Sequence, residues 1–130
     1  MIAVGEEIPP LVKDPVSKGQ LVRYAGASGD FNLIHTDVET ARSVGLDGVI
    51  AHGMLSMGFL GQLVTGFAGP EGVRRLQVRF GAMVRLGDVL TCRGVVKSVE
   101  PGGLVTLDIW AENARGEKVT TGEAEVRVPA

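Results

Sequence analysis

The sequence has a single cysteine, Cys92, only two histidines and no run of basic residues. A lone cysteine cannot form an internal disulfide, which suits a reducing compartment, and the first residues lack the basic and apolar regions of a secretory signal. We therefore expect a cytoplasmic protein. The formal net charge of −2 and the scatter of Lys and Arg offer no stripe to neutralise phosphates, so nucleic acid is not an expected partner.

Charged residues are also missing from one long stretch, residues 48–70, although they make up 22% of the chain. Apolar side chains fall on all sides of a helix over residues 53–67, which predicts that protein or lipid encloses it. Polar residues and glycines interrupt the stretch and no basic cluster flanks it, so a membrane span is the weaker interpretation. We expect a central helix wrapped by a sheet, and no membrane partner.

Two shorter helices are predicted before this stretch. Ser17, followed three residues later by Gln20, has the spacing of a capping box and begins the first helix. Thr36 begins the second by the same spacing, over residues 38–44. The loop SGDFNLIH, residues 28–35, lies between the two helices.

The hydrophobic period changes from helical to two after residue 70, which predicts β-strands. Four runs separated by turn residues are expected to form an antiparallel meander: 75–85, 88–99, 104–114 and 118–128. The predicted fold class is α+β, one domain over residues 1–130 with a curved antiparallel sheet around the central apolar helix. Because one sheet covers only one side of that helix, we also predict a homodimer.

The residues able to do acid–base chemistry lie just before the apolar helix. Asp30 and His35 could hold a carboxylate and an imidazole on either side of one water, as general acid–base catalysis requires. The spacing alone fits a simple turn at least as well, since Asp30 and Asn32 commonly bond their own backbone. Gly53 begins the helix, where a free N–H and the helix dipole could stabilise an enolate oxygen, or could simply let the chain turn while His52 packs or caps.

Other chemistries fit the sequence poorly. The two histidines and one carboxylate match no compact zinc spacing, and Cys92 in a predicted strand is expected to be a buried structural thiol. No serine lies in a nucleophile elbow, and the glycine-rich pieces fit neither a P-loop nor a dinucleotide fingerprint. We therefore expect no metal and no other cofactor.

Residues 24–35, YAGASGDFNLIH, resemble the hydratase motif of the MaoC-like family of (R)-specific enoyl-CoA hydratases and (3R)-hydroxyacyl dehydratases. Residues 51–54, AHGM, resemble the start of the family's central helix, and residues 78–80 and 86–88 match its first long strand and following turn. The likeness covers most of the chain in the right order. It implies a hot-dog fold, in which an antiparallel sheet wraps a long helix, usually paired into a dimer.

The resemblance also implies a function. Asp30 and His35 would hold the water that adds to the β-carbon of a trans-2-enoyl thioester, on coenzyme A or acyl carrier protein, giving the (R)-3-hydroxyacyl thioester. The Gly53 N–H would bind the thioester oxygen, with Asn32 also at the substrate. No cofactor is implied.

Three departures from the family pattern and two alternatives remain. Leu33 stands where the family loop usually has proline, and the strand-end proline expected near Met83 is missing. Gly61 stands where a hydroxyl residue often supports the catalytic Asp. One alternative is a hot-dog thioesterase in which Asp30 activates water at the carbonyl. The other is a non-catalytic acyl-binding subunit of a hydratase complex.

Overall fold

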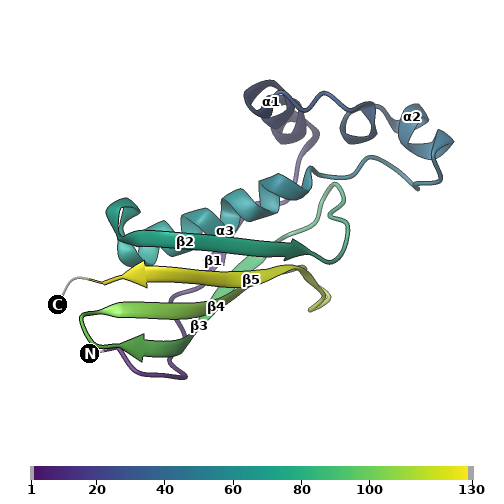
Figure 1. The fold of residues 1–130 in the computed structure, drawn as a ribbon. Helices are drawn as coiled ribbons and strands as arrows, with labels where there is room; N and C mark the ends of the chain where they lie inside the picture. The colour runs from purple at the N-terminus through teal and green to yellow at the C-terminus, as the bar shows by residue number, and fades with distance from the viewer. Residues whose placement is uncertain (1, 129–130) are drawn as a thin grey trace.

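The computed structural model describes residues 2–128 and shows a five-stranded antiparallel sheet with one long helix lying along it (Figure 1). The strands are β1 (Leu11–Val12), β2 (Val73–Phe80), β3 (Thr91–Glu100), β4 (Leu104–Glu112) and β5 (Lys118–Arg127). The helices are α1 (Lys18–Ser28), α2 (Val38–Ser43) and α3 (Gly53–Ala68), with short 3-10 turns η1 (Leu33–His35) and η2 (Pro70–Gly72). Met1 and residues 129–130, which the predicted domain includes, lie outside the described residues.

The strand order is β1-β3-β4-β5-β2, so the meander is confirmed for β3, β4 and β5 but is wrong for β2. β2 pairs with β5, and it ends at Phe80 although the alternating pattern continues to residue 85. Beyond that point Val84 accepts a hydrogen bond from the Ala51 N–H at 2.7 Å, and Ile50 bridges Arg85. The second half of the predicted strand therefore pairs with the segment that leads into α3 and fixes where that helix begins.

Helix α3 confirms the predicted central helix, and the sheet covers only one of its sides, as expected. One side packs on the inner face of the sheet through buried apolar residues that include Leu60, Leu63 and Val64. The opposite side exposes Met54 together with glycines and polar residues, because glycines supply little apolar surface to bury. Within residues 2–128, no helix is both long and apolar enough to cross a bilayer.

Helices α1 and α2 lie beyond the first turn of α3, at one end of the sheet (Figure 1). The Ser17 hydroxyl accepts the Gln20 N–H, as predicted, and Gly29, with a φ of 76°, caps α1 after Ser28. The cap of α2 is Asp37 in place of the predicted Thr36, and it makes no cap hydrogen bond to the helix backbone. Its carboxylate instead accepts the hydroxyl of Thr40, which lowers the pKa of Asp37.

Candidate active site

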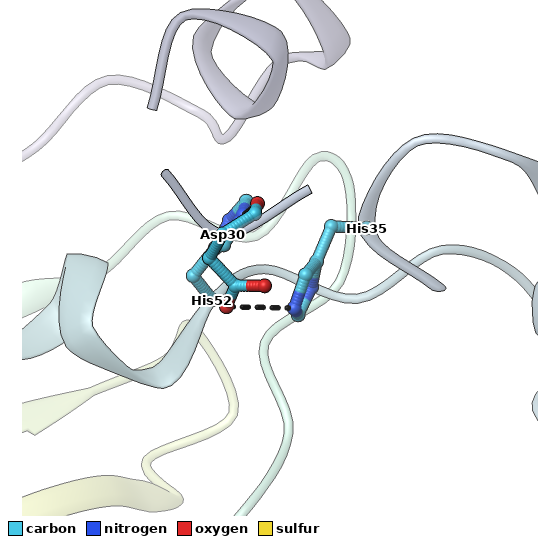
Figure 2. Close-up of side chains that lie close together, drawn as sticks. All are labelled: Asp30, His35 and His52. Carbon is cyan, nitrogen blue, oxygen red and sulfur yellow. Dashed lines mark hydrogen bonds and ion pairs between the residues drawn. The ribbon is translucent and has the colours of Figure 1, made fainter. Parts of the chain in front are cut away.

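The loop between α1 and α2 is built from side chains that bond their own backbone, as the turn interpretation predicts. Asp30 Oδ1 accepts the Asn32 N–H at 3.2 Å, and Asn32 Oδ1 accepts the Ile34 N–H at 3.2 Å to begin η1. These bonds use only one carboxylate oxygen of Asp30. The other, Oδ2, points at His35 (Figure 2), so the loop can be both a turn and a site for chemistry.

Asp30 and His35 are brought together across η1. Asp30 Oδ2 lies 3.7 Å from His35 Nε2, and the imidazole is 9% exposed while the carboxylate side chain is 52% exposed. His35 Nδ1 lies 2.7 Å from the carbonyl oxygen of Ile50, which can only accept, so Nδ1 carries a hydrogen. In the neutral imidazole, Nε2 therefore presents a lone pair towards Asp30. Two acceptors then face each other beyond direct hydrogen-bond distance, and a water to one side of them can donate a hydrogen bond to each.

His52 joins the loop to the start of α3. Its Nε2–H donates to the carbonyl oxygen of Asp30 at 3.1 Å, and its ring stacks on His35 with the centroids 3.8 Å apart. The Tyr24 ring also contacts His52, tilted by 57° with the centroids 4.8 Å apart. His52 is the residue before the first turn of α3, where it packs and makes no cap hydrogen bond through its side chain. It thus fixes Asp30 and His35 relative to the helix start.

The same three side chains offer ligand atoms within 4.8 Å of one another, but their geometry suits a metal poorly. The lone pairs of an imidazole lie in the ring plane, and the two rings are stacked with only 23° between their planes. The lone pairs therefore lie in nearly parallel planes and are poorly placed to converge on one ion. His35 Nδ1 and His52 Nε2 are also engaged by backbone oxygens. The cluster suits proton transfer better than cation binding.

Gly53 lies where α3 meets a cavity of about 340 Å³. The Phe80 ring covers its Cα so closely that an added Cβ would lie 3.3 Å from the ring. The lining of the cavity is mostly apolar and includes the hydroxyl residues Ser56 and Thr120, together with Ile50, Gly53, Phe80 and Met83. A molecule bound here would meet the N-terminus of a sixteen-residue helix, where backbone N–H groups and the helix dipole favour negative charge.

Sequence reasoning missed Ser56 and Thr120, whose hydroxyls are buried and lie 2.7 Å apart beside this cavity. The spacing of Ser56 from Gly53, one helical turn, was the available signal, since it places both on one side of the helix. Thr120 gave no comparable signal. It lies in β5, and a threonine is an ordinary residue in a β-strand.

Three other residues singled out in the sequence are Cys92, Leu33 and Gly61. Cys92 is fully buried in β3, as predicted, and burial raises its pKa to about 11, which makes it a poor nucleophile. Leu33 begins η1 and is 53% exposed. Gly61 faces Leu76 of β2, so no hydroxyl reaches Asp30 from that position.

An antiparallel sheet wrapped along one central helix, with the helix start at a polar loop, defines the hot-dog fold. A family model described as "MaoC like domain" matches residues 2–128, and the chain belongs to this family.

Individual relatives agree. The "(R)-specific enoyl-CoA hydratase" of Rhodospirillum rubrum is 33% identical over 117 residues, covering 88% of this chain and 81% of the relative. The "3-hydroxybutyryl-CoA dehydratase" of Methylorubrum extorquens is 30% identical over 121 residues, covering 92% and 77%. Among solved structures, the R-hydratase PhaJ1 of Pseudomonas aeruginosa superimposes with a TM-score of 0.90 at 29% identity, covering 98% of this chain and 83% of that one.

Proposed function

We propose that this protein is a hydro-lyase that reversibly adds water to a trans-2-enoyl thioester, carried on coenzyme A or acyl carrier protein, to give the (R)-3-hydroxyacyl thioester. The single observation that carries the proposal is the 3.7 Å separation of Asp30 Oδ2 and His35 Nε2. A water beside two acceptors at this distance can donate to both, which leaves an oxygen lone pair free to attack carbon. The names of the bacterial relatives supply the substrate class and the R configuration.

Asp30 and His35 together transfer the proton that moves in the reaction. As the water oxygen bonds to the β-carbon, one member of the pair removes a proton from that water. The electrons of the double bond move towards the thioester carbonyl. The proton taken from the water passes between Asp30 and His35 and is delivered to the α-carbon by the other member. Water is thus divided between the two carbons, and the pair is back in its starting state.

The Gly53 N–H is the proposed donor to the thioester oxygen. An α-carbon accepts negative charge only when the carbonyl oxygen is stabilised, and a helix N-terminus supplies a fixed dipole for this purpose. The absence of a side chain on Gly53 leaves room for the Phe80 ring against its Cα, and Gly53 lines the cavity. Asn32 keeps the proposed place at the substrate, although its Oδ1 already accepts a backbone N–H within the loop.

The direct test is the loss of enoyl absorbance when the purified protein meets crotonyl-CoA, followed by chiral analysis of the 3-hydroxybutyryl product. We expect turnover to the R product. Release of free thiol without loss of the double bond would instead show a thioesterase. Thioester binding without turnover, on coenzyme A and on acyl carrier protein alike, would show a non-catalytic acyl-binding subunit.

We also propose that the protein is a homodimer. β2 lies at an edge of the described sheet, and long exposed edges are usually paired or protected. Several large apolar residues around the site are at least 42% exposed: Phe31, Leu33, Met54, Phe80 and Met83. A second copy would cover such a surface. Light scattering coupled to size-exclusion chromatography should give twice the chain mass, and a monomer would contradict this proposal.

A further inference from the structure

Buried polar side chains gather at one place in the described chain. Five are found within residues 2–128: His35, His52, Ser56, Asn113 and Thr120. Asn113 is satisfied inside its own turn, where its Oδ1 accepts two backbone N–H groups. The other four surround the first turn of α3, and the proposed mechanism gives no part to Ser56 or Thr120.

The protons of this hydroxyl pair can be assigned by counting donors. Ser56 Oγ lies 2.8 Å from the carbonyl oxygen of Gly53, which can only accept, so the Ser56 hydrogen is used there. Ser56 must then accept at its 2.7 Å contact with Thr120 Oγ1. The chain of hydrogen bonds therefore runs from Thr120 on the sheet, through Ser56, to the backbone of Gly53.

The surroundings show what this chain holds in place. Thr120 pairs with Phe80 across the β5–β2 ladder, and the Phe80 ring lies against the Cα of Gly53. The first turn of α3 is thus held on the sheet at two points, by the ring and by the hydroxyl pair. On its other side His52 bonds to the backbone of Asp30. The turn therefore links the sheet to the loop of the acid–base pair.

Stability alone does not account for these hydroxyls. An apolar pair of the same shape would fill the space without the cost of removing two hydroxyl groups from water. The hydroxyls contribute orientation. A chain of hydrogen bonds fixes one orientation of the first turn of α3, whereas apolar packing would permit small shifts.

We infer that Ser56 and Thr120 are positioning residues, which hold the Gly53 N–H at a fixed place relative to Asp30 and His35. The inference rests on the proposed function. Neither residue transfers a proton to the substrate, and both act through the backbone of Gly53.

The test compares single variants with the double variant. Ser56→Ala and Thr120→Val each leave the other hydroxyl buried without its hydrogen-bond partner, so both stability and turnover should fall. Ser56→Ala together with Thr120→Val removes both partners, and its melting temperature should return close to that of the wild type. Its kcat on crotonyl-CoA should nevertheless stay about tenfold down, with less than about a twofold change in KM, because a small misplacement at a reacting centre has effects of this size or larger.

Two further variants serve as controls. Thr120→Ser keeps the hydroxyl and should retain most of the wild-type kcat. Val105→Ala truncates a fully buried residue of β4, six positions along the strand from Ala111, the β4 partner of Thr120, and hence about 20 Å away. It should lower the melting temperature without changing kcat. A double variant with wild-type kcat would overturn the inference.

Hydrogen exchange at the Leu55 amide gives a readout that does not depend on activity. This amide donates to the His52 carbonyl oxygen at 3.1 Å and so reports on the first turn. In the double variant the exchange rate of the Leu55 amide should rise by about tenfold. In the Val105→Ala variant this rate should change by no more than the loss of global stability accounts for. If the wild type hydrates no thioester, the proposed function fails. Unchanged Leu55 exchange in the double variant would overturn the inference in either case.

Discussion

The two ends of α3 differ in what surrounds them. Near its end, from Leu60 to Ala68, the buried residues of the helix are all apolar and pack on an apolar sheet. At its start, the buried residues around the first turn include two imidazoles and two hydroxyls. Burying polar groups costs free energy that an apolar core does not. The difference indicates that one end of the helix holds the fold together, while the other holds, at some cost in stability, the polar groups to which we assign the chemistry.

The largest expected effect comes from removing the imidazole nitrogen that faces Asp30. His35→Asn can keep the hydrogen bond to the Ile50 carbonyl, because the Asn amide can take the place of Nδ1, but it has nothing in the place of Nε2. We expect kcat on crotonyl-CoA to fall by about a hundredfold to ten-thousandfold, as for a lost general acid or base. The melting temperature should change little, and circular dichroism checks that the variant is folded. A kcat within a few-fold of the wild type would remove His35 from the mechanism.

The second expected effect lies at the apolar end. Leu63→Ala truncates a side chain that is 4% exposed, ten residues after Gly53 and hence about 15 Å along the helix. The lost contacts and the cavity should lower the free energy of unfolding by about 3 kcal/mol, measured by urea denaturation. Turnover per folded molecule at low temperature should stay within about twofold of the wild type. A loss of turnover as large as that of His35→Asn would show that the two ends are not separate.

The smallest expected effect concerns pH and the core thiol. Burial raises the pKa of Cys92 from an ordinary value of 9.0 to about 11, so the folded state holds its proton more tightly than the unfolded state. The corresponding stability is fully present below pH 9 and is lost as the pH rises towards 11, by about 2 kcal/mol. Unfolding of the wild type and of Cys92→Ala should therefore differ in slope between pH 9 and 11. Parallel curves would contradict the assignment.

The sequence predicted those parts of the fold that depend on local pattern. The period of two identified β3, β4 and β5, and the absence of charge identified α3. The sheet order escaped prediction because the pairing of β2 with β5 depends on a long-range crossover. The end of β2 at Phe80 also depends on a partner outside the sheet, the segment before α3, which sequence alternation cannot reveal.

The part of the candidate site that lies in one sequence motif was predictable. The part that is formed by tertiary contacts was not. Asp30 and His35 are close in sequence and lie in one loop, so their meeting could be expected. The stacking of His52 on His35 and the contact of Ser56 with Thr120 join segments that are far apart in the chain. Such pairs have no periodic signal, because the first depends on the pairing of η1 with the segment before α3 and the second on the packing of α3 on the sheet.

The most direct test of the account is the turnover of Asp30→Asn on crotonyl-CoA beside the wild type, with both proteins shown to be folded. The substitution keeps an oxygen for the Asn32 N–H but removes the charge and the proton-accepting oxygen that faces His35. The account predicts wild-type hydration to the R product, a melting temperature in the variant close to that of the wild type, and a kcat lower by about a hundredfold or more. A folded variant that turns over at nearly the wild-type rate would contradict the claim that the polar end of α3 performs the chemistry through this pair.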